Sequence, residues 1–211
     1  RALPVLFLWL FVVGFISFLV LFIYIELTLP APESIAARKV TESTKIYDKT
    51  GEVLLYDIHG EEKRTIIPWD QIPESAKKAT LASEDADFYN HKGLDITGIL
   101  RALLKDIRDL DLSQGGSTIT QQLVKKTLLG DEKTLTRKLK EALLSIEVEK
   151  RFTKDEILWM YLNQIPYGSN AYGIEAASKT FFSKTASELT TNESAILASL
   201  IKAPSYYSPY G

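Results

Sequence analysis

The sequence predicts a mainly α-helical domain that stands on a small β-containing neck and follows one N-terminal transmembrane helix. Residues 3–25 are apolar and carry no charge, which is typical of a membrane span. Residues 45–56 are strand-like on both sides of a turn at Gly51, and from Pro73 onward the pattern is helical almost throughout. The expected parts are an anchor at 1–29, a linker and hairpin neck at 30–72, and a helical domain at 73–211.

The composition excludes several kinds of site. The 211 residues include no cysteine, which rules out disulfides and thiolate metal sites, and the two histidines lie far apart in the sequence. A formal net charge of −2 with scattered basic residues argues against a nucleic-acid partner. Ligand spacing therefore predicts no metal site, and the sequence requires no cofactor.

The segment Leu3–Ile25 predicts a membrane anchor. At about 1.5 Å per residue it crosses a hydrocarbon core of roughly 30 Å, and Trp9 and Tyr24 lie toward its two ends. The alternative is a buried core helix, whereas a signal peptide fits poorly because no small-residue cleavage site follows. The flanking charges do not decide the orientation. Because the chain begins with Arg1 and stops at Gly211, we expect both ends to be cut from a longer protein.

The remaining elements follow from local signals. Pro30 and Pro32 end the first helix, and the strand-like residues 64–68 are expected to add to the hairpin. An amphipathic helix from Ile96 to Leu110 either faces the core or lies at a bilayer surface. The further helices expected are one with Ser117 as N-cap, one striped by Leu135, Leu139, Leu143 and Ile146, one opened by a capping box at Thr153–Glu156, one at 172–182, and one at 193–201 with Asn192 as cap.

The most informative segment is residues 84–95, which holds four carboxylates, two aromatic rings, a histidine and a glycine. Acids beside aromatic side chains indicate carboxylates held against an apolar wall, a setting in which a carboxyl group can serve as a general acid or base. The alternative is a helix end with solvated acids and a Phe–Tyr pair in the core.

A second polar cluster spans residues 115–126. Glycines before a helix start expose main-chain N–H groups, and the helix dipole adds positive charge there, so this end could bind an anion. Helical spacing places several hydroxyls, amides and one ammonium on one strip: Ser117, Thr118, Gln121, Gln122 and Lys125. The alternative is an ordinary capped helix with a polar face.

A third cluster consists of Arg137, Lys138 and Glu141, which are three and four residues apart and share a helix face. Two cations and a carboxylate in this arrangement could bind a phosphate leaving group. An exposed ion-pair helix is the alternative.

In this order the three clusters resemble the peptidoglycan glycosyltransferase family, a domain of class A penicillin-binding proteins and of monofunctional transglycosylases. The resemblance covers about residues 43–211, and two later segments, 154–168 and 195–209, are similar to further motifs of the family. Trp159 stands where many members carry Glu, and Ala86-Asp87 replaces an arginine-bearing pair. The matching residues of the first motif are Glu84, Asp85, Phe88, Tyr89, His91 and Gly93.

The resemblance implies a lysozyme-like helical fold and the polymerisation of lipid II into β-1,4-linked glycan by inverting displacement of undecaprenyl pyrophosphate. Glu84 would be the general base on the acceptor sugar's 4-hydroxyl, and Glu141 would be the second family carboxylate. Substrate contacts would come from Ser117, Thr118, Gln121, Gln122, Lys125, Arg137 and Lys138, with Lys133 a weaker candidate, and support from Asp85, Phe88, His91, Gly116, Tyr161 and Asn163.

The resemblance also implies partners and a location. The partners would be lipid II, the growing glycan-lipid, the bilayer and a cell-wall synthesis complex, and a magnesium or manganese ion could accompany the substrate pyrophosphate. The expected location is the bacterial cytoplasmic (inner) membrane, single-pass, with the catalytic domain on the outer, periplasmic face. A glycan-cleaving muramidase or lytic transglycosylase is one alternative, and the intact second cluster with Lys125 argues against it. A non-catalytic membrane-anchored scaffold is another, and the presence of Glu84 and Glu141 argues against that.

Overall fold

The computed structural model describes residues 2–37, 44–50, 54–58, 63–101, 116–130, 132 and 134–202. Within them the fold is mainly helical with small sheets, as predicted. The helices are α1 (Ala2–Leu27), α2 (Ser34–Ala37), α3 (Glu74–Glu84), α5 (Ile119–Val124), α6 (Leu135–Arg151), α7 (Lys154–Gln164), α8 (Ile174–Phe182) and α9 (Thr191–Lys202). Short 3₁₀ turns form η1 (Trp69–Gln71) and η3 (Ala186–Glu188), a π-helix forms η2 (Lys125–Leu129), and the strands are β1 (Thr44–Tyr47), β2 (Leu54–Ile58), β3 (Lys63–Arg64), β4 (Pro166–Gly168) and β5 (Ala171–Tyr172).

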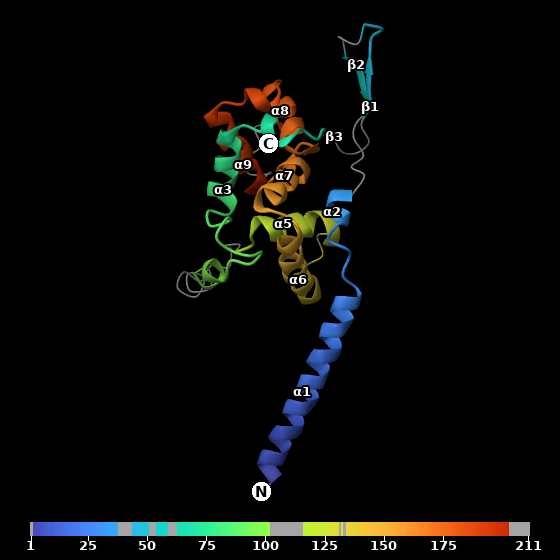
Figure 1. The fold of residues 1–211 in the computed structure, drawn as a ribbon, viewed down its shortest axis with the longest axis vertical. Helices are drawn as coiled ribbons and strands as arrows, with labels where there is room; N and C mark the ends of the chain where they lie inside the picture. The colour runs from blue at the N-terminus through green and yellow to red at the C-terminus, as the bar shows by residue number, and fades with distance from the viewer. Residues whose placement is uncertain are drawn as a thin grey trace.

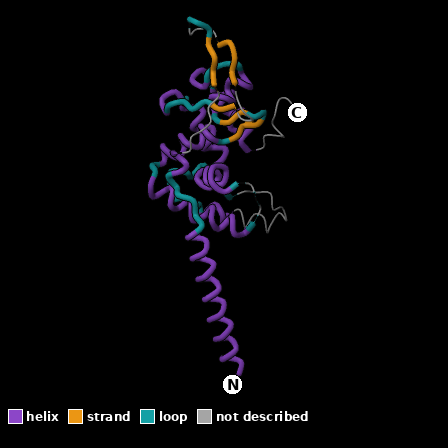
Figure 2. Tube along the Cα trace, turned by 90° about the vertical axis from the view of Figure 1, so that its right-hand side faces the viewer, coloured by secondary structure: helices purple, strands orange, loops and turns teal. Residues whose placement is uncertain are grey.

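The molecule is elongated because two elements extend from its helical body. Helix α1 extends from one end, and the β1–β2 hairpin extends beyond the opposite end (Figures 1 and 2). The remaining helices pack together between them, with α3 against α9 and α5 against both α6 and α7. The body therefore contains the elements that carry all three polar clusters.

The strands form two separate sheets, and one prediction about them was wrong. The antiparallel β1–β2 pair confirms the hairpin, although its turn at residues 51–53 lies outside the described residues. Strand β3 does not join the hairpin but pairs in parallel with β5, in a sheet ordered β3-β5-β4. The reason is that Ile67, just after β3, is buried in the helical body, so this segment belongs to the body.

Helix α7 provides the centre of the core. Its Ile157, Leu158, Tyr161 and Leu162 are fully buried, and α5 contributes Ile119 and other apolar side chains to the same cluster. The capping box predicted at Thr153–Glu156 opens α7 as expected. Two neighbouring helix starts differ from the prediction. Tyr172 lies in β5, so α8 begins only at Ile174, and Asn192 lies inside α9, whose first turn is capped by Thr190.

The buried face of α6 differs from its most apolar stripe. Leu135 is 86% exposed and Leu139 is 47% exposed, whereas Glu141, Leu144 and Val148 face the core. Only the helix was predicted correctly here. Which face α6 buries depends on its contacts with α5 and α7, and the hydrophobic periodicity of α6 alone does not predict these contacts.

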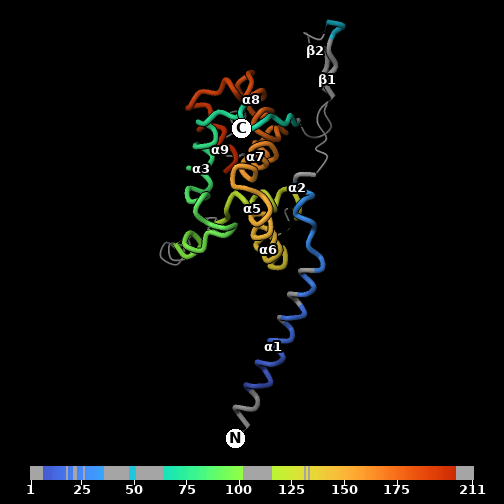
Figure 3. The backbone as a smooth tube through the Cα atoms, in the orientation of Figure 1, coloured from blue at the N-terminus to red at the C-terminus, as the bar shows by residue number. Residues whose placement is uncertain are grey.

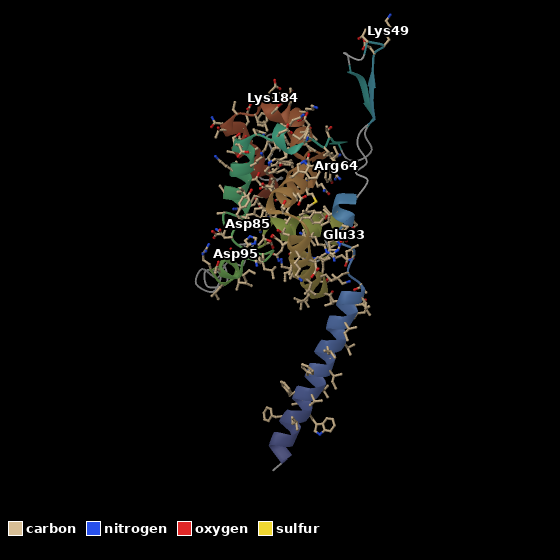
Figure 4. The ribbon with its side chains drawn as sticks, in the orientation of Figure 1. Glu33, Lys49, Arg64, Asp85, Asp95 and Lys184 are labelled. Atoms are coloured by element: carbon tan, nitrogen blue, oxygen red, sulfur yellow. The ribbon has the colours of Figure 1, made fainter. Side chains whose placement is uncertain are left out.

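The chain that leaves α1 runs along α6. Figure 3 shows α2 beside the helical body, and Glu33, labelled in Figure 4, lies just before α2. Ile35 of α2 is buried in the core, and Glu33 forms an ion pair with Arg151 at the end of α6. The Lys140 ammonium lies 5.9 Å from the centroid of the Tyr24 ring near the end of α1. Among the described parts of the chain, no helix combines the length and the apolar character that a bilayer span requires. The span at residues 3–25 therefore stays a prediction.

Candidate active site

A cleft of about 530 Å³ lies where α3, α5, α6 and α9 meet. It brings together six of the predicted residues, which come from all three clusters: Glu84, Ser117, Gln121, Gln122, Lys125 and Glu141. Ser83, Lys126, Ile201 and Lys202 complete the lining, and the sequence analysis missed them. Lys126 is the last residue of the second cluster, but nothing local marks Lys202, which reaches the cleft only because α9 packs against α3.

Glu84 is the last residue of α3, and its two carboxylate oxygens have unequal surroundings. Oε2 accepts a hydrogen bond from Gln122 Nε2 at 2.8 Å. Oε1 has only a long contact, 3.4 Å from Ser83 Oγ. Among the described residues one oxygen is thus firmly bound, while the other keeps capacity to accept a proton, and Glu84 lines the cleft.

Gln122 connects Glu84 to the core. Its Oε1 accepts a hydrogen bond from the hydroxyl of Tyr161 at 2.8 Å, so the amide bridges the two side chains. Burial raises the pKa of the Tyr161 hydroxyl well above its ordinary value, and the neighbouring Glu84 carboxylate raises it further. The phenol therefore keeps its proton and remains a hydrogen-bond donor.

Asp85 joins the end of α3 to the start of α5 (Figure 4). Its Oδ2 accepts from the Ile119 main-chain N–H at 2.9 Å and lies 3.0 Å from His91 Nε2. Phe88 is fully buried and meets the His91 ring edge-on. These contacts explain how the first cluster holds Glu84 in place: the acidic residue after it satisfies an N–H at a helix start.

Thr118, and not Ser117, is the N-cap of α5. Its hydroxyl accepts from the Gln121 N–H while the Gln121 amide oxygen accepts from the Thr118 N–H, a reciprocal capping box. The Thr118 hydroxyl donates to the Gly93 carbonyl at 2.6 Å. Thr118 is buried and lies outside the cleft lining, so its surroundings are those of a structural residue.

Glu141 is almost fully buried, and both of its carboxylate oxygens are occupied. Arg137 Nη1 donates to Oε2 and Lys138 Nζ donates to Oε1. The Lys138 ammonium also donates to Ser117 Oγ at 2.9 Å, so the second and third clusters are in direct contact. Arg137 is mostly buried and lines an adjoining hollow together with Lys140.

Asn163 lies outside the cleft and holds the chain after β3. Its Oδ1 accepts from the Ile67 N–H at 2.9 Å, and its amide donates to the Ile67 and Trp159 carbonyls. Trp159 Nε1 donates to the same Ile67 carbonyl, so both side chains fix this segment on α7. Gly115, Lys133, the predicted helix beyond residue 101 and the final motif beyond residue 202 lie outside the described residues.

In the part of the chain that the structure describes, no three acidic or histidine side chains gather to form a metal site.

Comparison with known proteins gives consistent matches. Residues 51–211 match the family described as Transglycosylase. Penicillin-binding protein 1A of Aquifex aeolicus (strain VF5) is 44% identical over 196 residues, which cover 93% of this chain and 27% of that protein. Penicillin-binding protein 1A of Escherichia coli (strain K12) is 44% identical over 189 residues, 90% of this chain and 22% of that protein. Penicillin-binding protein 1A/1B of Bacillus subtilis (strain 168) is 43% identical over 201 residues, which cover 95% of this chain and 22% of that protein. The chain thus spans about a quarter of the length of these relatives.

Proposed function

The chain belongs to the Transglycosylase family, and we propose that its helical domain is a peptidoglycan glycosyltransferase that polymerises lipid II into β-1,4-linked glycan. The family match and the similarity to penicillin-binding proteins support this activity. The observation that carries this proposal is a single cleft lined by two carboxylates that differ in how many of their oxygens are bound. Among the described residues, Oε1 of Glu84 has only the long contact with Ser83, whereas both oxygens of Glu141 are bound by cations.

Glu84 is the general base. A sugar hydroxyl is a weak nucleophile, so a carboxylate must take its proton as the oxygen attacks the anomeric carbon. The open Oε1 of Glu84 suits this step because Gln122 engages only Oε2. An α-linked pyrophosphate that becomes a β-glycoside requires one inverting displacement, so no covalent intermediate is needed.

The cationic residues stabilise the departing pyrophosphate. Negative charge develops on this leaving group in the transition state, and cations already in place stabilise it without reorganisation. Lys125 lines the cleft, and Lys138 donates a hydrogen bond to Ser117 in the same lining. Glu141 holds Arg137 and Lys138 in position, and taking a proton would cost it one of these partners. A magnesium or manganese ion carried by the pyrophosphate would add to this charge.

The proposed location rests on the N-terminal segment. We propose that α1 anchors the protein by a single pass in the bacterial cytoplasmic membrane, with the catalytic domain on the outer, periplasmic face. Residues 3–25 carry no charge, and large apolar side chains of α1 such as Phe7, Trp9 and Phe11 are exposed. Partners in a cell-wall synthesis complex would be reached through α1 and the neck.

The test is polymerisation of purified lipid II in detergent by the protein and by Glu84→Gln. Glycan strands from the parent, with at least a hundredfold lower rate in the variant, are expected because the general base is lost. Glu147→Gln, which changes a partly exposed carboxylate on α6, is the matched control and should keep full activity. Unchanged polymerisation by Glu84→Gln would remove the base assignment, and cleavage of preformed glycan without polymerisation would point to a lytic enzyme.

A further inference from the structure

Oε2 of Glu84 accepts a hydrogen bond from the side-chain amide of Gln122. Glutamine itself does not determine which end of this amide points toward Glu84. The two ends of a glutamine amide are nearly equal in shape, yet one donates and the other accepts. With Nε2 toward Glu84, the amide stabilises the carboxylate form. With Oε1 toward Glu84, it would repel the carboxylate and accept a hydrogen bond from the protonated acid. Whatever orients Gln122 therefore influences which form of Glu84 is favoured.

Tyr161 is the group that orients this amide. Its hydroxyl donates to Gln122 Oε1 at 2.8 Å, and Gln122 Nε2 donates to Glu84 Oε2 at 2.8 Å. The three side chains come from α7, α5 and α3, so tertiary packing brings them into line. Because burial keeps the Tyr161 proton in place, the phenol donates throughout the working pH range.

We propose that Tyr161 is a positioning residue that acts through Gln122 to keep an amide N–H on Glu84, and so to keep Glu84 ready as a base. This inference rests on the proposed glycosyltransferase activity. It assigns no contact with substrate to Tyr161, whose side chain is fully buried behind the cleft.

A second buried tyrosine offers a matched control. Tyr167 on β4 is as buried as Tyr161, and the Glu84 carboxylate also acts on it, since after burial it is the cause that raises the pKa of the Tyr167 hydroxyl. Its hydroxyl, however, makes no hydrogen bond to any residue that the structure describes. Tyr161→Phe and Tyr167→Phe each remove one buried oxygen beside the same carboxylate, and only the first breaks the link to Gln122.

Other charged groups around Glu84 stay the same in both variants. They are Lys125, Lys126, Glu141 and Lys202 in the cleft, and Asp85 next in the chain. A difference in activity between the two variants therefore reports the hydrogen bond through Gln122 and not the overall electrostatic field of the site.

The experiment measures kcat and KM for lipid II polymerisation between pH 5 and 9. Tyr161→Phe should lower kcat about fivefold on the acidic side, the rate equivalent of one ordinary hydrogen bond, and move the acidic limb of the profile to higher pH. KM should stay within about twofold, because no substrate contact is lost. Tyr167→Phe should overlay the parent. In a Gln122→Met background, adding Tyr161→Phe should change nothing further, because the connecting amide is gone.

Three results would overturn the inference: a parent-like profile in Tyr161→Phe, an equal shift in Tyr167→Phe, or a full Tyr161→Phe effect without Gln122. If the parent itself makes no glycan, the proposed function fails, and a second readout still tests the link. NMR of the Gln122 side-chain amide, assigned with Gln122→Met, should show a shifted resonance in Tyr161→Phe and an unmoved one in Tyr167→Phe. Equal amide shifts in all three proteins would refute it.

Discussion

The buried carboxylate of Glu141 makes a stability prediction that tests the description of the third cluster. Replacing Glu141 with Leu removes the partner of two cations. The Arg137 side chain is 15% exposed, so it would be left mostly buried with its charge uncompensated, and breaking such a pair costs about 3 kcal/mol. The Lys138 side chain is 47% exposed and can turn to water, so it adds less than about 1 kcal/mol. Glu141→Leu should therefore lower the free energy of unfolding by about 3 kcal/mol.

The assay is urea unfolding in a fixed concentration of non-ionic detergent, followed by tryptophan fluorescence. With a urea dependence of about 2 kcal/mol per molar, the midpoint should fall by about 1.5 M. The double variant Arg137→Met with Glu141→Leu should recover to within about 1 kcal/mol of the parent, since an apolar pair replaces a buried ion pair at little cost. Glu147→Leu, on the same helix but partly exposed with Lys150, should move the midpoint by less than about 0.5 M.

Two outcomes would refute this reasoning. A midpoint for Glu141→Leu that equals the parent's would mean that the carboxylate does not hold a buried cation. A double variant as unstable as the single one would mean that packing volume, and not uncompensated charge, accounts for the loss.

Three further predictions concern other parts of the fold. Gly93→Ala should lower the free energy of unfolding by about 3 kcal/mol, because Gly93 has a φ of +88° and a Cβ would lie 2.8 Å from a main-chain carbonyl of α6. Gly130→Ala, at φ +75° with open space around it, should lower it by only about 1 kcal/mol. Equal losses in urea unfolding would contradict the clash at Gly93. Asn163→Ala should cost about 2 kcal/mol because a buried main-chain N–H loses its acceptor, and an unchanged urea midpoint would argue against that. Hydrogen bonding from Lys184 is the largest cause that lowers the pKa of the Glu193 carboxyl, from 4.5 to about 2, so its stabilisation is complete above pH 4.5 and is lost as the pH falls through about 2. Glu193→Gln should therefore flatten the acid side of the stability curve in that window, and a parent-like slope would exclude this contribution.

The sequence by itself predicted the local features well. Helical spacing identified α6 and α7, and the Thr153–Glu156 capping box marked the start of α7, because both signals involve residues within one turn of each other. It also selected six of the polar residues that line the cleft, since helix starts, glycine turns and charge pairs are short-range patterns. Even so, the first residue of α5 was misplaced by one position. The N-cap is Thr118 and not Ser117, because the Gln121 side chain forms the reciprocal capping box with Thr118.

Tertiary structure decided what those residues do. Whether a side chain enters the core or the cleft depends on which distant elements pack beside it, and no local periodicity carries that information. Contact with the rest of the body placed Glu141 in the core and left Leu135 in solvent on the same helix. The pairing of β3 with β5 likewise joins segments about a hundred residues apart. The unequal oxygens of Glu84 exist only because α5 and α7 bring Gln122 and Tyr161 to the end of α3. Orientation and burial are properties of contacts between elements, so they emerge only when the elements are packed together.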